Sequence, residues 1–398
     1  MLAMLTKALV SVLFLLSVAR HGSSAQSYNA IYNFGDSISD TGNLCTGGCP
    51  SWLTNGQPPY GNTYFGRPTG RCSDGRVFVD FLAEFFGLPL LPPSKANGTD
   101  FKKGANMAII GATAMNLDFF ESHGLGSSVW NNGPLDTQIE WFGQLMPSIC
   151  GSAGGECPCP AYKLLNPNLV MTNVPNHNVP FRGSIDCKSY LKNSLFILGE
   201  FGGNDYNAPI FGGKGLDEVT SYVPQIIDKI RSGIERLIGL GATEVVVPGV
   251  LPIGCFPLYL TLYGSSNQSD YDGDGCLRRF NDLSSYHNQL LQQAIHDLQS
   301  KYTGVRLMYG DFYSQVTEMV RDPVSFGLKY GLNVCCGASG QGSYNYNNEA
   351  RCGMPGSSAC QDPDNYLNWD GIHLTEASHR SIAYGWLTGP YCSPAILY

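Results

Sequence analysis

The chain has 398 residues, of which 43% are hydrophobic and 14% are charged, as in a globular protein with a large apolar core. Its formal net charge is -8, from 24 basic and 32 acidic residues. Contacts to phosphate backbones require clustered Lys and Arg, which this acidic chain lacks, so nucleic acid is not an expected partner.

The first predicted element is a secretory signal over residues 1–25. Lys7 precedes an apolar run at residues 8–19, and small residues lead up to a cleavage site after Ala25. The run is shorter than the roughly 20 residues that span a bilayer, and we predict no transmembrane segment later in the chain. A buried first helix is the alternative interpretation. We expect one domain over residues 26–398, exported to the cell exterior, the cell wall or the vacuole.

The 14 cysteines all follow this signal, which is consistent with disulfides formed in an oxidising compartment. The sequence does not give their pairing. No two CxxC motifs stand at zinc-finger spacing, so we predict no metal site and no cofactor. Asn97 and Asn267 begin N-x-S/T sequons, each of which could carry a glycan or remain an unmodified polar loop.

The rest of the chain alternates short apolar runs with segments of helical periodicity. The runs suited to buried strands lie at residues 30–34, 107–110, 195–198, 245–247 and 305–308. Helical spacing of apolar residues covers residues 79–86, 216–240, 283–298 and about 375–386. Strands separated by helices predict an α/β protein, with a parallel sheet of about five strands covered on both faces.

Three of the predicted strands are followed by residues that could serve an active site. Ser37 follows the first, at the carboxyl edge where open parallel sheets place their ligands. Gly111 closes the second run and offers a backbone N–H. Asn204 follows two glycines after the third and offers an amide donor that never changes charge. The alternatives are structural: Ser37 could cap a helix, Gly111 could simply end a strand, and Asn204 could be a turn residue.

A base and its partner are available near the C-terminus. Asp370 stands three residues before His373, a spacing at which the carboxylate can hydrogen-bond the imidazole across a turn and fix its tautomer. The alternative is a helix N-terminus with Asp370 as its cap. We expect His379 on the outside of the last helix, away from the site. We expect Asp40 in a turn or cap rather than as a competing acid.

Asp270, Asp272 and Asp274 resemble the start of a calcium-binding loop. Such a loop would need a bidentate carboxylate at position 281, but the residue there is Asn281, whose side chain is an amide. We therefore expect a solvated acidic loop there.

Four sequence blocks in this order resemble those of plant GDSL esterases/lipases, within the SGNH hydrolase superfamily. They read FGDSISDTGN, GANMAIIGATA, GEFGGNDYN and WDGIHLTEA, and the resemblance covers nearly the whole chain after the signal. It implies a three-layer α/β/α sandwich with a flavodoxin-like sheet. It also implies hydrolysis of small-molecule or cell-wall esters by a serine nucleophile, without a cofactor.

Carried onto this sequence, the resemblance makes Ser37 the nucleophile, His373 the base and Asp370 its partner. The oxyanion hole would consist of the Ser37 N–H, the Gly111 N–H and the Asn204 side-chain amide. Two other functions remain open. An acyltransferase would use the same residues to pass the acyl group to an alcohol, and a secreted binding protein would not be catalytic.

The chain departs from the family pattern most clearly at residues 151–185. This insertion is rich in Pro and Asn, and relatives pass quickly through the same region. A structureless insertion of this length is uncommon in a compact domain. It is either a surface loop or retained non-coding sequence.

Overall fold

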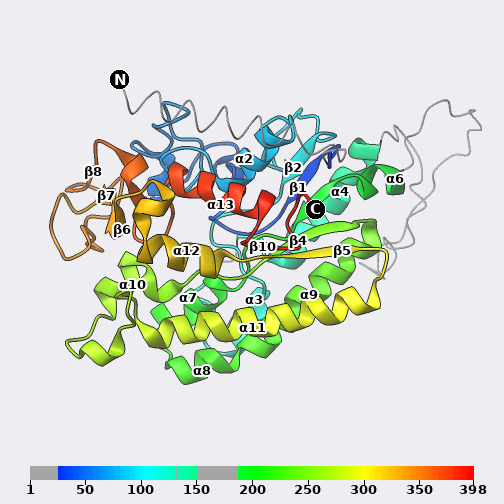
Figure 1. Ribbon diagram of the computed structural model, residues 1–398. Helices are drawn as coiled ribbons and strands as arrows, with labels where there is room; N and C mark the ends of the chain where they lie inside the picture. Colours follow the sequence, from blue (N-terminus) through cyan, green and yellow to red (C-terminus); the bar gives the residue numbers. More distant parts are fainter. Residues whose placement is uncertain (1–25, 131, 151–186) are drawn as a thin grey trace, which may run out of the picture.

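The computed structural model describes residues 26–130, 132–150 and 187–398 (Figure 1). The predicted signal segment and the insertion at residues 151–185 lie outside the described residues.

A six-stranded sheet runs through the centre of the molecule (Figure 1). In spatial order its strands are β10 (Cys392–Ser393), β5 (Arg306–Gly310), β4 (Glu244–Pro248), β3 (Leu195–Ile197), β1 (Ile31–Asn33) and β2 (Gly104–Asn106). The pairs from β2 to β5 are parallel, and β10 is antiparallel to β5. The strand order 2-1-3-4-5 is flavodoxin-like, with its switch point between β1 and β3. The predicted α/β class is confirmed, with β10 as an added edge strand.

The second strand lies earlier than predicted, at β2 instead of residues 107–110. The predicted run continues alongside β1, since Met107 N donates to Asn33 O at 2.7 Å and Ile109 N to Gly35 O at 3.1 Å. A Cβ at Gly104 would lie 2.5 Å from Ile31 O, so the strand itself requires a residue without a side chain. A search for apolar runs overlooks such a strand.

Helices cover both faces of the sheet (Figure 1). On one face, α2 (Phe78–Phe85) packs against α13 (Glu376–Thr388), which also contacts α12 (Phe312–Arg321). On the other face, α9 (Val223–Leu240) packs between α4 (Leu135–Cys150) and α11 (Arg278–Lys301). The result is the three-layer α/β/α sandwich that the resemblance implied.

Shorter elements connect these layers. The helices are α3 (Leu117–Ser122), α6 (Cys187–Lys192), α7 (Gly203–Phe211), α8 (Leu216–Ser221) and α10 (Pro257–Leu262). Outside the main sheet, β6 (Tyr330–Val334) pairs with β9 (Tyr366–Asn368), and β7 (Cys336–Gly337) pairs with β8 (Ser358–Ala359).

An aromatic cluster joins the sheet to α4. Tyr32 on β1 packs against Phe142 of α4 and Phe196 of β3, with ring centroids 5.0 and 5.4 Å apart, and Phe34 contacts the Phe142 ring edge-on. All four side chains are fully buried. Burial of one such side chain stabilises the fold by about 1.5–3 kcal/mol, so this cluster fixes the strand that precedes Ser37.

The segment predicted as one helix over residues 216–240 forms two, α8 and α9. Pro224 lies in the first turn of α9 and has no N–H to continue the hydrogen bonds of α8. The helix ends at Gly241, whose φ of +115° suits a residue without a Cβ.

The prediction for His379 is wrong, because its side chain is only 1% exposed. It lies on the face of α13 that packs against α2, and its ring stacks on Phe78 at 6.4 Å. Ile382, Ala383 and Trp386 share this buried face at helical spacing. Burial lowers the pKa of His379 to about 3. It does not line the cavity described below, as expected.

Within the described residues, five disulfides connect ten cysteines. The pairs are Cys45–Cys49, Cys150–Cys187, Cys255–Cys276, Cys335–Cys360 and Cys336–Cys352. Within the described residues, Cys72 and Cys392 are unpaired and buried. Two of these disulfides, Cys335–Cys360 and Cys336–Cys352, lie in the C-terminal segment around β7 and β8, and Cys336 is itself part of β7.

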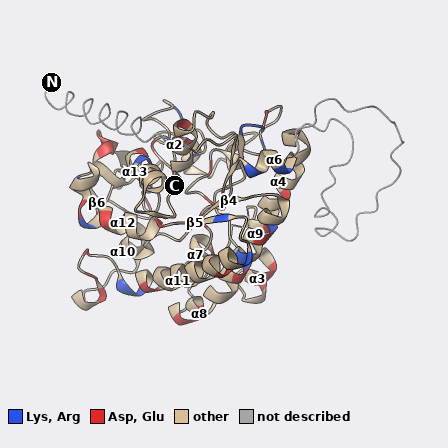
Figure 2. Cartoon of the chain, turned by 45° about the vertical axis from the view of Figure 1, so that its right-hand side comes forward, with Lys and Arg blue, Asp and Glu red and all other residues tan. Residues whose placement is uncertain are grey.

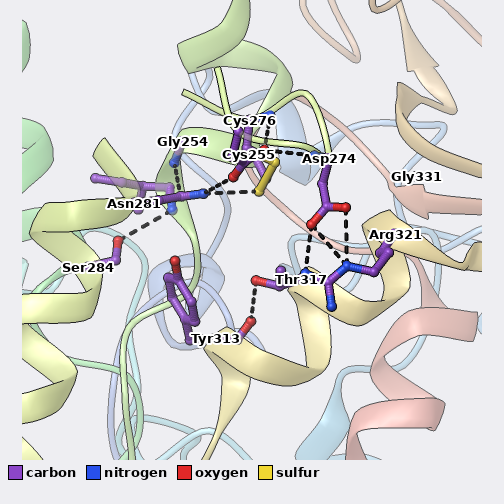
Figure 3. Close-up of a disulfide and its surroundings, with 12 residues drawn as sticks. Gly254, Cys255, Asp274, Cys276, Asn281, Ser284, Tyr313, Thr317, Arg321 and Gly331 are labelled. Carbon is purple, nitrogen blue, oxygen red and sulfur yellow. Dashed lines mark hydrogen bonds and ion pairs between the residues drawn. A yellow bond between two sulfur atoms is a disulfide. The ribbon is translucent and has the colours of Figure 1, made fainter. Parts of the chain in front are cut away.

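The acidic loop beside the Cys255–Cys276 disulfide is held by its own protein contacts (Figure 3). Asn281 accepts a hydrogen bond from Gly254 N at 2.9 Å, and Asp274 pairs with Arg321 at 2.9 Å. Asp272 accepts from the backbone N–H of Asp274 and of Cys276. Across the described residues, no group of three or more His, Cys, Asp or Glu side chains gathers as a metal site.

Charged residues of both signs are interspersed over the outer helices in the view of Figure 2. Within the described ranges, no helix combines the length and apolar character needed to cross a bilayer.

Candidate active site

Ser37 stands in a tight turn directly after β1. Gly35 begins that turn with φ +125°, and a Cβ there would lie 3.0 Å from the Cα of Gly199, so only glycine fits. The side chain of Gln138, on α4, clamps the turn: it donates to Gly35 O at 2.7 Å and accepts from Gly35 N at 2.8 Å. The Ser37 side chain is thereby held at the carboxyl edge of the sheet, with the residue 8% exposed.

His373 and Asp370 complete a chain of hydrogen bonds to Ser37. Nε2 of His373 lies 2.9 Å from Ser37 Oγ, and Nδ1 lies 2.9 and 3.0 Å from the two carboxylate oxygens of Asp370. A carboxylate on Nδ1 fixes that nitrogen as the donor, which leaves Nε2 free to accept the serine proton. The structure thus brings together the three residues that the sequence singled out from distant positions.

The Asp370 carboxylate is itself oriented by three donors. The backbone N–H groups of Ile372 and His373 bind Oδ1 at 2.9 and 2.8 Å. The hydroxyl of Tyr60 binds Oδ2 at 2.8 Å, and its ring packs edge-on against Trp369. Sequence reasoning missed Tyr60, because it lies in an irregular segment rich in Gly and Pro, 310 residues from its partner.

These contacts set the charge states of the pair. Burial disfavours the charged form of His373 and so lowers its pKa. The Asp370 carboxylate and the Cys72 side chain act in the opposite direction and outweigh burial, so the pKa of His373 lies well above its ordinary value. Burial likewise opposes ionisation of Asp370, yet the imidazole and the two backbone N–H groups lower its pKa. Cys72 lies beside the imidazole, and burial raises the pKa of its thiol.

Two backbone N–H groups in this region have no acceptor among the described residues. Within the described parts of the chain, neither Ser37 N nor Gly111 N donates a hydrogen bond. Both residues line one cavity. Since buried N–H groups are almost always paired, these two are suited to an oxygen atom of a bound ligand.

The loop that carries Gly111 is positioned by Asp40. Its carboxylate accepts from Ile110 N at 3.0 Å and from Gly42 N and Asn43 N at 2.7 Å each. The prediction of a turn role for Asp40 is confirmed, and burial raises its pKa to about 6. Gly111 adopts φ +80°, and a Cβ there would meet Trp130 at 2.9 Å.

Asn204 lies in the first turn of α7 and lines the same cavity. Its Nδ2 donates to Ala112 O at 3.0 Å and to the Asp36 carboxylate at 2.8 Å. The bond to Ala112 ties the amide to the loop that carries Gly111, so the predicted oxyanion donors are drawn from three adjacent segments.

The cavity above Ser37 has a volume of about 530 Å³. Its lining includes apolar side chains from α7, α10 and the loop before α10, which are Ala208, Phe211, Phe256, Leu258 and Leu262. It also includes Trp130, Tyr346 and Arg351, and Arg351 is the only Lys or Arg among the described lining residues. A cavity of this size and character suits a small, largely apolar ligand.

A serine hydroxyl, an imidazole and a carboxylate lie in series at the carboxyl edge of a parallel α/β sheet, which is the arrangement that serine hydrolases use.

Comparisons with known proteins agree. The family model described as GDSL-like lipase/acylhydrolase matches residues 31–386. Two GDSL esterases/lipases of Arabidopsis thaliana are each 39% identical, over 96% and 98% of this chain and 89% of each relative. A sinapine esterase of Brassica napus is 39% identical, over 95% of this chain and 90% of its own length. The chain therefore belongs to the GDSL lipase/acylhydrolase family and is a carboxylic ester hydrolase.

Proposed function

We propose that the chain is a secreted esterase that hydrolyses carboxylic esters through a covalent acyl-Ser37 intermediate. The observation that carries this proposal is the 2.9 Å contact between His373 Nε2 and Ser37 Oγ, with Asp370 on the far side of the ring. Capping a helix or ending a turn would require neither contact.

In the first half of the reaction, His373 removes the Ser37 proton as the hydroxyl oxygen attacks the ester carbonyl. The carbonyl oxygen becomes an oxyanion, which the N–H groups of Ser37 and Gly111 and the Asn204 amide stabilise. His373 then gives its proton to the leaving alcohol. In the second half, His373 removes a proton from water as the water oxygen attacks the acyl-serine ester, and it returns this proton to Ser37 Oγ as the acid is released.

The cavity supports a substrate of modest size. Its apolar lining suits an acyl or aryl group, and Arg351 offers a cation to a polar substituent. We propose a small-molecule ester, with a cell-wall ester as the second candidate. The name sinapine esterase, borne by one relative, makes aromatic acyl esters the first compounds to assay.

Secretion and glycosylation belong to the same proposal. Five disulfides within the described residues favour folding in an oxidising compartment. Asn97 and Asn267 are both exposed, as glycosylation of their sequons requires.

The test is to assay the purified secreted protein with a chromogenic acetate ester and to look for an acyl group on the Ser37 peptide by mass spectrometry. Ser37→Ala should lose the acyl adduct and nearly all of kcat, since removal of a triad nucleophile costs roughly a million-fold. Ser51→Ala, at an exposed serine that does not line the cavity, is the matched control. A Ser37→Ala protein that retained more than about a hundredth of wild-type kcat would contradict the assignment. An added alcohol that diverted the product from acid to ester would favour the acyltransferase.

A further inference from the structure

Two more carboxyl groups line the cavity beside the oxyanion donors. Asp36 follows β1 and Glu200 follows β3, the strand that pairs with β1. Each residue is only 4% exposed, and the two carboxyl groups are hydrogen-bonded to each other. A hydrogen bond between two carboxyl groups requires a proton on one of them.

Their remaining contacts hold both groups in fixed positions. Asp36 accepts from Ile38 N and from Asn204 Nδ2, at 2.9 and 2.8 Å. Glu200 accepts from Gly203 N at 2.9 Å, and a Cβ on Gly203 would lie 2.9 Å from both of its carboxyl oxygens. The first turn of α7 is therefore built closely around the Glu200 carboxyl group. The contact is made by Gly203, the residue before Asn204.

The surroundings decide which carboxyl group keeps the proton. Burial raises the pKa of Glu200 well above its ordinary value, and Asp36 and Asp205 add to that shift. Burial also raises the pKa of Asp36, but its hydrogen bonds and the nearby His373 work against the shift. Tyr206, whose pKa burial raises well above 10, stays neutral. Asp36 accepts two N–H hydrogen bonds, which favour its charged form, whereas Glu200 accepts one, so we assign the proton to Glu200 and the negative charge to Asp36.

We propose that Glu200 is a positioning residue for ester hydrolysis: as a neutral acid it donates a hydrogen bond to Asp36, which in turn holds the Asn204 amide at the oxyanion site. This rests on the proposed function of the same site. Glu200 thus acts on Asp36, and Asp36 accepts a hydrogen bond from the Asn204 amide. The same amide also donates to Ala112 O in the loop that carries Gly111.

The shared proton also matters for charge. Both N–H groups of the Asn204 amide are engaged in the free protein, by Asp36 and by Ala112 O. A developing oxyanion must compete with Asp36 for one of them, and a carboxylate of full charge is a strong acceptor. The hydrogen bond from Glu200 weakens Asp36 as an acceptor and keeps a second negative charge away from the oxyanion.

The test compares Glu200→Ala with Glu200→Gln, because glutamine has the same shape, can donate to Asp36 and never ionises. Glu200→Ala should lower kcat about tenfold to a hundredfold with little change in KM, less than the loss of a direct oxyanion donor. Glu200→Gln should restore most of that kcat. In the wild type, kcat should decline on the alkaline side as Glu200 loses its proton, and Glu200→Gln should lack this decline. Glu318→Gln, at an exposed position on α12, is the control and should keep the wild-type pH profile.

An infrared measurement decides the protonation state without relying on turnover. The C=O stretch of a protonated carboxylic acid should persist in the wild type at pH 8 and be absent from Glu200→Gln. The proposal is overturned if this band is missing from the wild type, if Glu200→Ala keeps wild-type kcat, or if Glu200→Gln keeps the alkaline decline. If Glu200→Ala does not fold, the glutamine variant and the infrared band still decide. A wild-type protein with the band but no hydrolysis of any ester would instead refute the proposed function, and the positioning role with it.

Discussion

Ser37 and His373 meet at 2.9 Å, yet different parts of the molecule hold them there. Ser37 depends on the central sheet: β1 is paired on both sides, its aromatic side chains pack on α4, and Gln138 clamps the turn that follows. These contacts are non-covalent and lie in the main core.

His373 lies outside that sheet, after β9, which pairs with β6 in a separate two-stranded sheet. Its segment is fastened by backbone bonds from Cys335 N to Asn368 O and from Cys336 N to Trp369 O, and both cysteines are in disulfides. Tyr60 adds the side-chain contact to Asp370. The position of Ser37 therefore depends on packing in the main core, whereas the position of His373 depends on the two disulfides and on Tyr60.

Among the residues that hold Ser37 and His373 in place, the largest effect is expected at Asp370. Asp370→Asn should retain the fold but lower kcat about 10⁴-fold, because an amide at this position favours the wrong tautomer of His373. Steady-state kinetics on a neutral ester would measure the loss. Asp364→Asn, at an exposed position just before β9, is the control. A loss of less than tenfold would remove Asp370 from the site.

On the Ser37 side of the site, Asn204→Ala should lower kcat by about 10² to 10³ with little change in KM. This is the size of effect expected for the loss of one oxyanion donor. The same kinetic assay, with the unfolding midpoint measured in parallel, separates this effect from a loss of stability. Unchanged kcat would return Asn204 to the role of a turn residue.

The role of the disulfides that fasten the His373 segment can be tested by replacing Cys336 and Cys352 with serine. The unfolding free energy should fall by about 3 kcal/mol, because the bridge closes a loop with a sequence separation of 16 residues. The kcat should fall as well, since the bridge fastens the segment before His373. Serine at both Cys45 and Cys49, whose bridge spans a separation of only 4 residues, should cost less in denaturant unfolding. If the two double variants lost the same unfolding free energy and the same kcat, the special role of the Cys336–Cys352 disulfide in holding His373 would be contradicted.

The smallest effect is expected from Tyr60→Phe, which removes one hydrogen bond to a charged group and should lower kcat/KM about tenfold at pH 7. The base must be neutral, so kcat/KM should fall on acidification, with a midpoint above the ordinary 6.5 because Asp370 raises the pKa of His373. Loss of the Tyr60 bond leaves Asp370 more negative, so the midpoint of the variant should move higher still. A pH–rate profile that stays flat down to pH 4 would show that no imidazole is the base.

The sequence was sufficient to predict the parts of the site that stand at recognisable positions. Ser37 and Asn204 follow apolar strands, and Asp370 and His373 share a short turn. Tyr60 and Gln138 were missed because their roles arise from contacts across 310 and 103 residues, with no local pattern around them. Glu200 stands inside one of the four sequence blocks, but its role depends on burial beside Asp36.

The errors in the fold have similar causes. β2 is built from Gly104, Ala105 and Asn106, and β10 has two residues, so neither shows the apolar run that identifies a strand. His379 was placed outside because a polar residue suggests a solvated face. The fit of its ring against Phe78 overrode that preference, and the buried imidazole stays neutral.

The Cys150–Cys187 disulfide has a consequence for how this chain can change over evolutionary time. It joins the residues that flank the insertion, with their Cα atoms 5.1 Å apart, so a covalent bond holds the two ends of the insertion together. Lengthening a loop is cheap, since each doubling costs only about 0.6 kcal/mol in closure entropy. Insertions and deletions between these cysteines can therefore accumulate as nearly neutral drift, while α4 and the strand that follows α6 keep their register.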